Sequence, residues 1–222
     1  IIKLDDFRYD LTKKEIFYDV GANYGLYTAL VSYLVKEGEV HSFEPRRDVF
    51  KYLQKNFKYD KNVFLNNLAL SDKKGELTMY FTKYYSGRST INRKSTATWH
   101  GILSEKIHST TLDEYTSKRR KPTIIKVDIE DSEELFIKGG LRTMRQAKPI
   151  IIMEVSGGSR WIFSRKALKL LSKVNYIPYF VNSDGTTEAT SYKKIEELVK
   201  KMDSSFCDNL IFIHKKSKRI II

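Results

Sequence analysis

Cysteine and long apolar runs are almost absent from this sequence of 222 residues. Cys207 is the only cysteine, which excludes an internal disulfide and a thiolate metal cage and is typical of a reducing compartment. Because it falls in an apolar stretch expected to be a strand, we interpret it as a buried structural thiol. No stretch approaches the roughly 20 consecutive apolar residues of a membrane-spanning helix, and no signal-peptide pattern is present. We therefore expect a soluble, cytoplasmic protein.

Internal repeats and low-complexity tracts are also lacking. A chain of this length with 41% hydrophobic residues can bury one sizeable core and does not require a second. We expect a single domain over residues 1–222. The first residue is Ile1 rather than methionine, which suggests a segment cut from a longer polypeptide.

Positive charge is abundant, with a formal net charge of +13. The basic residues are spread along the chain, and the two local runs, at residues 118–121 and 215–219, are expected in exposed loop or tail. A solvated surface is the simpler interpretation. The alternative is an anionic partner, such as RNA, a nucleotide-sugar or membrane headgroups.

Short apolar runs alternate with longer amphipathic stretches, which is typical of an α/β protein with a mainly parallel sheet. The runs predict seven strands, near residues 16–20, 39–44, 63–69, 123–129, 149–155, 177–182 and 207–214. Helical periodicity occurs at about 25–36, 46–58, 132–146, 160–174 and 190–202. The last two strands could close the sheet with one antiparallel member. Residues 84–108 are polar and aromatic, and we expect a loop or lid there.

The first predicted strand leads directly into a glycine turn and then a helix. Backbone N–H groups and the positive end of the helix would meet a ligand there, either a phosphate or the carboxylate of a methionine moiety. A dinucleotide fingerprint needs three glycines, but only Gly21 and Gly25 are present, so an NAD oxidoreductase is disfavoured. Asp19 suits an ammonium group better than a diphosphate. The candidate cofactor-binding residues of this turn are Asp19, Gly21, Ala22, Asn23, Tyr24 and Gly25.

Two later strand ends add a nucleoside signature. Glu44 ends the second predicted strand, where a carboxylate can accept hydrogen bonds from both ribose hydroxyls. After the third strand, Asn67, Ala69 and Ser71 are candidate neighbours of an adenine ring, although they could equally be ordinary core residues.

The fourth predicted strand ends in acidic residues, which are costly at such a position unless they are solvated, paired or used. Asp128 would face the crevice at the carboxyl edge of the sheet, and it is our first candidate for a general base or a contact to a substrate hydroxyl. Lys126 either pairs with a neighbouring acid or orients the acceptor. Glu130 and Asp131 could instead simply favour the start of the following helix. His100, in the polar loop, is an alternative base, although a lone loop histidine is more often incidental.

The ordered segments resemble FkbM-type methyltransferases, which are S-adenosylmethionine-dependent O-methyltransferases. The matching segments are residues 19–25 (DVGANYG), 43–45 (FEP), 67–75 (NLALSDKKG), 110–115 (TTLDEY) and 126–130 (KVDIE). The resemblance implies a Rossmann-like class I methyltransferase fold, a cofactor site at Gly21, Asn23 and Glu44, and a substrate-side role for the KVDIE segment. Asp131 stands where that family usually has glycine.

The resulting hypothesis is methyl transfer to a hydroxyl of a sugar or glycoconjugate, since Tyr84, Tyr85, Arg88, Trp99 and His100 would offer stacking faces and hydrogen-bond donors. RNA ribose 2′-O-methylation is an alternative motivated by the net charge. That chemistry usually surrounds its hydroxyl with a Lys, Asp, Lys, Glu set, and the second lysine cannot be placed convincingly after Asp128. A cofactor-binding module without catalysis is the other alternative.

A divalent cation is a further alternative for the acidic strand ends. Asp128 and Glu130 could hold Mg²⁺ together with Glu154, which ends the fifth predicted strand and is also a candidate catalytic residue. We do not favour a metal, because a sulfonium already has a good leaving group and the reaction needs mainly alignment and proton removal.

Overall fold

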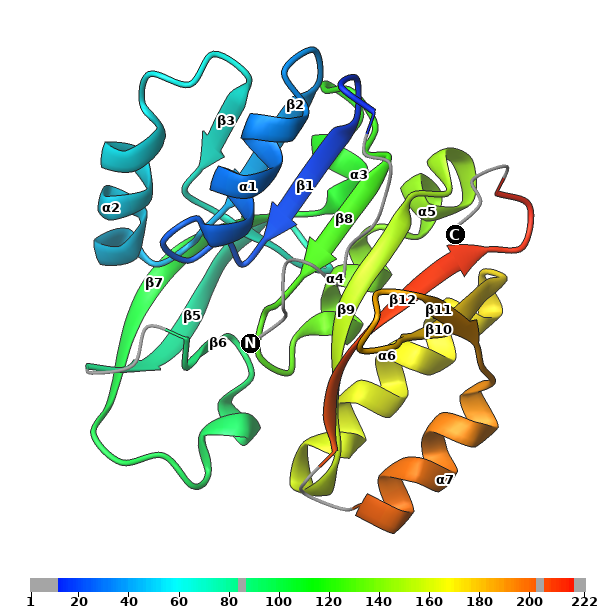
Figure 1. Ribbon diagram of the computed structural model, residues 1–222. Coiled ribbons are helices and arrows are strands. Elements are labelled where there is room, and N and C mark those ends of the chain that lie inside the picture. The colour runs from blue at the N-terminus through cyan, green and yellow to red at the C-terminus, as the bar shows by residue number, and fades with distance from the viewer. Residues whose placement is uncertain (1–11, 84–86, 203–205, 218–222) are drawn as a thin grey trace.

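The computed structural model describes residues 12–83, 87–202 and 206–217 (Figure 1). Within them, eight strands form a main sheet in the order β11-β10-β12-β9-β8-β1-β2-β3. These strands are β1 (Ile16–Val20), β2 (Glu39–Phe43), β3 (Val63–Asn66), β8 (Ile124–Val127), β9 (Ile150–Ser156), β10 (Tyr176–Val181), β11 (Thr187–Ala189) and β12 (Cys207–His214).

Five neighbouring strands, β3, β2, β1, β8 and β9, are parallel, so their carboxyl ends meet at one edge of the sheet. β12 runs antiparallel between β9 and β10, and β11 pairs antiparallel with β10. The predicted Rossmann-like α/β fold and its antiparallel member are confirmed. The main sheet has eight described strands rather than seven because β11 is short and lacks the apolar run by which strands were predicted.

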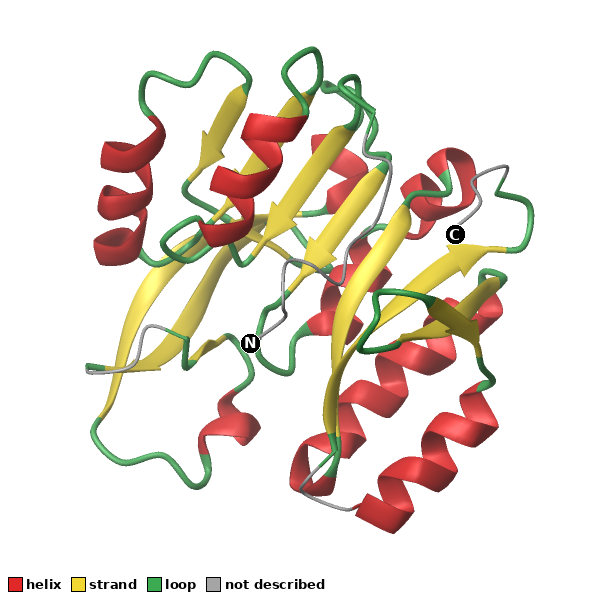
Figure 2. Cartoon of the chain, viewed as in Figure 1, coloured by secondary structure: helices red, strands yellow, loops and turns green. Residues whose placement is uncertain are grey.

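Helices cover both faces of the main sheet (Figure 2). One face carries α1 (Leu26–Leu34) and α2 (Arg47–Phe57), and the other carries α3 (Leu112–Tyr115), α4 (Glu133–Gly139), α5 (Leu141–Ala147), α6 (Trp161–Lys173) and α7 (Tyr192–Met202). Alternation along β1 explains the two layers: Tyr18 packs in the core beneath α3–α7, whereas Phe17 belongs to the core beneath α1.

The helix predicted over residues 132–146 is divided in two at Gly140. This glycine lies so close to α3 that an added Cβ would be 2.7 Å from Cδ2 of Leu112. The break therefore lets α4 end and α5 begin while α3 packs directly against the junction. Gly139 and Gly140 are successive glycines, which weaken a helix at this position.

A second, smaller sheet lies beyond the carboxyl ends of β1, β2 and β3 (Figure 1). It contains β4 (Ala69–Leu70), β5 (Gly75–Thr82), β6 (Ser89–Thr90) and β7 (Ile102–Thr110), in the order β4-β7-β5-β6. The prediction of an irregular loop over residues 84–108 is therefore wrong for β6 and most of β7. Between them lies a short 3₁₀ helix, Arg93–Thr96. Tyr84 and Tyr85 lie outside the described residues.

Cys207 corrects another expectation, because its side chain is exposed rather than buried. It is the first residue of β12 and pairs with Ser156, the last residue of β9, so it lies at the end of its strand. Among the helices that the structure describes, none is long and apolar enough to cross a bilayer.

Candidate active site

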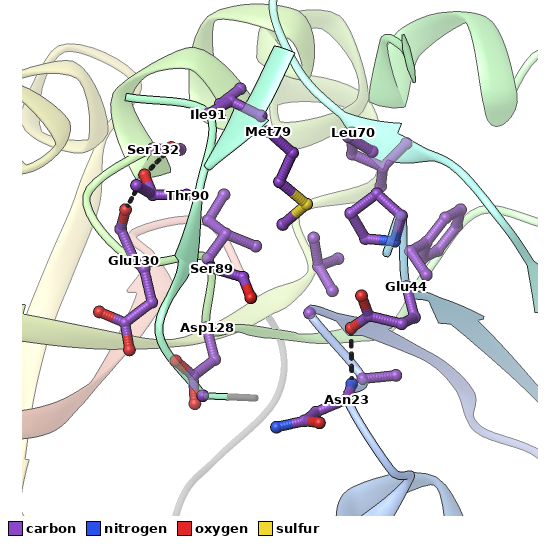
Figure 3. A pocket seen from close by; sticks show the side chains of 18 of the residues that line it. Asn23, Glu44, Leu70, Met79, Ser89, Thr90, Ile91, Asp128, Glu130 and Ser132 are labelled. Carbon is purple, nitrogen blue, oxygen red and sulfur yellow. Dashed lines mark hydrogen bonds between the residues drawn. The ribbon is translucent and has the colours of Figure 1, made fainter. Parts of the chain in front are cut away.

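A pocket of about 360 Å³ opens at the carboxyl edge of the parallel strands, a size within the range of small-molecule sites (Figure 3). One wall comes from the glycine turn after β1 and from Glu44 after β2. The opposite wall comes from Asp128 and Glu130 after β8 and from Glu154 in β9. The smaller sheet covers the space between the walls with residues that include Met79 and Ser89.

The glycine turn brings two strand ends into close contact. Gly21 has a φ of +86°, and an added Cβ would lie 1.9 Å from the carbonyl oxygen of Asp128. The amides of Gly21 and Ala22 both donate to the carbonyl of Phe43 at 3.0 Å. These amides are therefore engaged within the protein, and what the turn offers a ligand is its close backbone approach and the helix that follows it.

Glu44 is a buried acceptor at the bottom of this wall. Its side-chain oxygens accept hydrogen bonds from the backbone amides of Asn23, at 3.0 Å, and Arg46, at 2.9 Å. Burial raises the pKa of Glu44 to about 7, because desolvation outweighs the two hydrogen bonds and nearby Arg46. Asn23 Oδ1 is also buried, with no hydrogen-bond partner among the described residues. Both acceptors would be satisfied by a ligand that brings hydroxyl or ammonium donors.

Asp128 lies across the pocket and is supported from below by Lys126. The Lys126 ammonium contacts Asp128 Oδ2 at 3.2 Å, and its side chain is only 1% exposed whereas that of Asp128 is 46% exposed. The ammonium also lies over the ring of Tyr27, 5.2 Å from its centroid. A buried cation thus holds a carboxylate whose other side remains accessible in the pocket.

Arg160, at the start of α6, connects the acidic residues of the second wall. Its guanidinium contacts Glu130 Oε2 at 2.8 Å, Asp131 Oδ1 at 2.7 Å and Glu154 Oε1 at 3.3 Å. Burial raises the pKa of Glu130 to about 7; Arg160 opposes this rise, and the neighbouring carboxylates add to it. One cation thus holds three carboxylates in place.

The segment that follows β8 has an unusual backbone. Glu130 and Asp131 have φ values of +49° and +68°, in the left-handed region that favours glycine. Aspartate tolerates this region better than most residues, and here its carboxylate also gains Arg160 as a partner. The substitution of Asp131 for the expected glycine is thereby accommodated. The described residues contain no group of three acidic, histidine or cysteine side chains arranged to hold a metal ion.

Comparison with known proteins identifies the family. The sequence profile described as "Methyltransferase FkbM domain" matches residues 19–201. The chain belongs to the FkbM methyltransferase family. Membership implies a methyltransferase and agrees with a pocket at the carboxyl edge of a class I sheet. No curated protein sequence matches this FkbM domain significantly.

Solved structures resemble the FkbM domain in fold. An FkbM methyltransferase from Methylobacillus flagellatus KT has a TM-score of 0.57 at 16% identity; the match covers 93% of this chain and 45% of that protein, so this chain spans less than half its length. A putative rRNA methylase from Clostridium thermocellum has a TM-score of 0.54 at 14% identity, with 94% and 90% covered. Fibrillarin from Aeropyrum pernix, solved with bound S-adenosyl-L-methionine, has a TM-score of 0.50 at 9% identity, with 96% and 70% covered. At these identities the likeness concerns the fold.

The predicted cofactor residues of the FkbM domain divide into two groups. Those that line the pocket are Gly21, Ala22, Asn23, Tyr24, Glu44 and Ala69. Those outside its lining are Asp19, Gly25, Asn67 and Ser71.

Each of the second group has a contact within the protein. The Asp19 carboxylate lies beneath α1 and accepts a hydrogen bond from Thr28 Oγ1 at 2.7 Å, with its pKa raised to about 6 by burial. The Asn67 amide donates to the carbonyls of Glu44, at 2.9 Å, and Pro45, at 3.0 Å. Ser71 is fully buried, and Gly25 is in contact range of the Phe57 ring.

The predicted catalytic residues are also divided. Asp128, Glu130 and Glu154 line the pocket, and Lys126 lies beneath Asp128. His100 is exposed, between the 3₁₀ helix and β7, and is not among the lining residues.

Sequence reasoning missed two parts of this site. The first is Arg160, which belongs to no motif and meets Glu130 from 30 residues further along the chain. The second is the contribution of the smaller sheet, which adds Met79, Ser89, Thr90 and Ile91. The signal available in the sequence was two successive stretches of mixed polar and apolar residues. These stretches form the two longer strands of the smaller sheet, β5 and β7, which pair antiparallel.

Proposed function

We propose that this FkbM domain transfers the methyl group of S-adenosylmethionine to a hydroxyl of a sugar or glycoconjugate. The observation that carries the proposal is that a single pocket joins the glycine turn and Glu44 on one side to the Asp128 carboxylate on the other. Cofactor and acceptor would therefore meet in the middle, between two walls of different chemistry.

The first wall fits the cofactor. Glu44 would accept hydrogen bonds from the ribose hydroxyls, since each of its oxygens has one backbone donor and can accept another hydrogen bond. Asn23 Oδ1 needs a donor and would meet one in the ammonium group or a hydroxyl. Ala69 and Met79 add apolar surface against which the adenine ring would pack.

Asp128 is the residue we propose to remove the proton. When bound, S-adenosylmethionine supplies an electrophilic methyl group on its sulfonium. The Asp128 carboxylate would accept the proton of the acceptor hydroxyl as that oxygen forms its bond to carbon. Lys126 Nζ holds Asp128 Oδ2 from the buried side and so keeps the other oxygen directed into the pocket. No metal is required in this step.

The second wall favours an uncharged polyhydroxyl acceptor. Its carboxylates, Glu130 and Glu154, share Arg160 and can accept hydrogen bonds from neighbouring sugar hydroxyls. Among the described residues that line the pocket, none is lysine or arginine. A phosphate beside this wall would meet negative charge, which weighs against RNA as the acceptor.

The proposal is tested with labelled S-adenosylmethionine and panels of glycans, nucleotide-sugars and RNA, for wild type and Asp128→Asn. We expect transfer to a glycan, a fall of at least about 100-fold in the variant, and unchanged cofactor affinity by calorimetry. Asp72→Asn, an exposed aspartate outside the pocket, is the matched control. Cofactor binding without transfer to any acceptor would instead indicate a non-catalytic module, and transfer to RNA alone would overturn the choice of acceptor.

A further inference from the structure

Exposed apolar side chains are concentrated on one part of the surface. Ten large hydrophobic side chains are exposed in the described residues, and six of them lie between residues 24 and 59. They belong to α1, to α2 and to the residues beside these helices: Tyr24, Leu26, Tyr33, Leu34, Tyr52 and Tyr59. Leu26 is 68% exposed, Tyr33 70% and Tyr59 84%. Scattered exposed hydrophobic residues are ordinary, but a contiguous group of this kind marks an interaction site.

Helix α1 is apolar on its solvent side as well as on its buried side. Its sequence, LYTALVSYL, contains no charged residue. Thr28 and Val31 face the core, while Leu26 and Tyr33, two helical turns apart, face outwards. A helix that is apolar all round is normally buried, so the solvent side of α1 is expected to have a partner.

Helix α2 places a row of lysines beside this apolar side. Lys51, Lys55 and Lys58 are exposed and lie at i, i+4 and i+7, on one side of the helix. None of the three has an ion-pair partner among the described residues. The contrast with α7 is direct, because the α7 lysines 193, 194 and 200 each contact a glutamate within 3.8 Å.

The two helices form one continuous surface. Residues of both, including Tyr33 and Phe57, line a shared groove toward their carboxyl ends. At the other end, the rings of Tyr24 and Tyr52 contact each other edge to face, with centroids 5.7 Å apart. The helices also lie side by side on the same face of the sheet (Figure 1). We call this surface, comprising Tyr24, Leu26, Tyr33, Leu34, Tyr52, Tyr59 and the three lysines, the α1–α2 face.

We propose that the α1–α2 face docks on a bilayer surface that contains anionic phospholipids. Leu26, Tyr33 and Tyr59 would enter the boundary between headgroups and acyl chains, and the lysine row of α2 would lie among the phosphates. Lysine side chains reach the headgroups while their stems remain on apolar surface. The net charge of +13 acts in the same direction over a longer range.

Two other occupants fit the α1–α2 face less well. A second copy of the chain meeting this face across a two-fold axis would bring two unpaired lysine rows together, and these would repel each other. Single-stranded RNA could stack on the tyrosines, but it would leave the aliphatic Leu26 and Leu34 without a matching surface. An anionic bilayer matches both the charge and the aliphatic side chains.

The α1–α2 face lies next to the pocket. Tyr24, Leu26 and Tyr27 line the pocket as well as lying beside or within α1. A docked molecule would therefore have its pocket opening next to the headgroups. Docking itself does not depend on methyl transfer, so the two proposals can fail separately.

The test is co-sedimentation of the protein with vesicles of phosphatidylcholine alone or mixed with phosphatidylglycerol. We expect binding only to the anionic vesicles, weakened by added salt. A Lys51→Glu/Lys55→Glu/Lys58→Glu variant should lose at least about 100-fold in partition coefficient, from about fivefold for each lysine. Tyr33→Ser, outside the pocket, should lose roughly fivefold through reduced apolar burial.

Matched controls come from α6, on the opposite face of the sheet. Arg165→Glu/Lys169→Glu/Lys173→Glu reverses three exposed basic residues at i, i+4 and i+8, and Ile162→Ser changes a side chain that is 58% exposed. Both should retain most of the wild-type binding to vesicles, and thermal unfolding should show that all variants are folded. Equal losses in the α6 variants would overturn the proposal, because binding would then follow net charge alone.

Two further measurements distinguish the other occupants. Binding of oligouridine without binding of anionic vesicles, abolished by the α2 triple variant, would overturn the proposal in favour of RNA. Sedimentation velocity showing a dimer that Tyr33→Ser dissociates, without vesicle binding, would overturn it in favour of a second copy. A monomer that binds anionic vesicles through the α1–α2 face supports it.

Discussion

The two walls of the pocket are built in different ways. The proposed cofactor wall takes its polar groups from a short piece of chain, residues 21–44, and these groups are fixed by backbone contacts such as the Asn23 amide on Glu44. The acceptor wall is held by side chains that meet across the fold, with Arg160 joining Glu130, Asp131 and Glu154. In the proposed function, cofactor recognition would thus depend on a local stretch of sequence, whereas acceptor recognition would depend on tertiary structure.

The largest effect is expected at Gly21, where close contact between backbone segments fixes the first wall. In Gly21→Val, the new Cβ would lie 1.9 Å from the Asp128 carbonyl oxygen at a left-handed φ, so we expect loss of cofactor binding and a fall of more than about 3 kcal/mol in unfolding free energy. Urea denaturation and calorimetry measure both. Gly101→Val is the control, because its φ of +63° is also left-handed but a Cβ there meets nothing within 4 Å and the residue lies outside the pocket lining. Wild-type stability in Gly21→Val would show that the wall does not depend on this contact.

Glu44→Gln should affect the proposed cofactor wall alone, because it removes a negative charge from that wall only. The substitution retains the size of the side chain but removes a charged acceptor, so we expect S-adenosylmethionine to bind roughly 30-fold more weakly, with the KM for the acceptor unchanged. Glu76→Gln, an exposed position on β5, is the control. Cofactor affinity within twofold of wild type would remove Glu44 from the proposed ribose contact.

Arg160→Met should have the reverse effect of Glu44→Gln: use of the acceptor should be impaired while cofactor affinity stays unchanged. Loss of the shared cation would leave three carboxylates close together and raise the pKa of Glu130 further, so kcat/KM for the acceptor should fall about tenfold. The rising limb of the pH–rate profile should also move to higher pH if ionised Glu130 contacts the acceptor. Cofactor affinity should stay the same, and Arg160→Lys should restore part of the activity. An equal loss of cofactor affinity would show that the two walls are not independent.

The smallest effect concerns pH. Burial raises the pKa of Glu44 to about 7 in the free protein, and the proposed ribose contact needs the ionised form. Cofactor affinity should therefore fall about eightfold between about pH 7.5 and about pH 6.

Stability should change with pH in the opposite direction. Because the pKa values of Glu44, Glu130 and Asp19 are all raised in the folded state, the folded state binds more protons than the unfolded chain between about pH 5 and about pH 7. Unfolding free energy in the absence of cofactor should then decrease as pH rises.

Calorimetry and urea denaturation across this pH range test the two trends together. Glu44→Gln is the matched variant, because it cannot ionise and should show little pH dependence of cofactor affinity. An affinity that is constant from about pH 6 to about pH 7.5 in wild type would contradict the role given to Glu44.

The difference between the walls also explains what could be predicted from sequence. Strand ends followed by glycine or acid are local signals, and they led to Gly21, Glu44 and Asp128, which all line the pocket. Asp19 was expected to contact a ligand, but alternation along β1 turns its carboxylate toward α1, where Thr28 binds it. Arg160 could not be found in this way, because only the folded chain brings α6 to the end of β8.

The smaller sheet was missed for a different reason. β5 and β7 have few buried positions, and the small core of this sheet has three buried hydrophobic members, Ala69, Met79 and Ile107. Strands exposed on much of their surface lack the continuous apolar runs that identified β8 and β9. The polar composition of β7 was therefore interpreted as a loop.

The smaller sheet enters and leaves the fold at nearly the same place, since Ala69 pairs with Ser109 and Leu70 with Thr110. The chain between these pairs is an insertion that can be shortened, lengthened or exchanged without altering the strand order of the main sheet. It carries Met79, Ser89, Thr90 and Ile91 over the pocket. The segment between residues 71 and 108 is therefore a natural unit for transplantation between related domains, by which substrate choice could be changed while the glycine turn and Glu44 are retained.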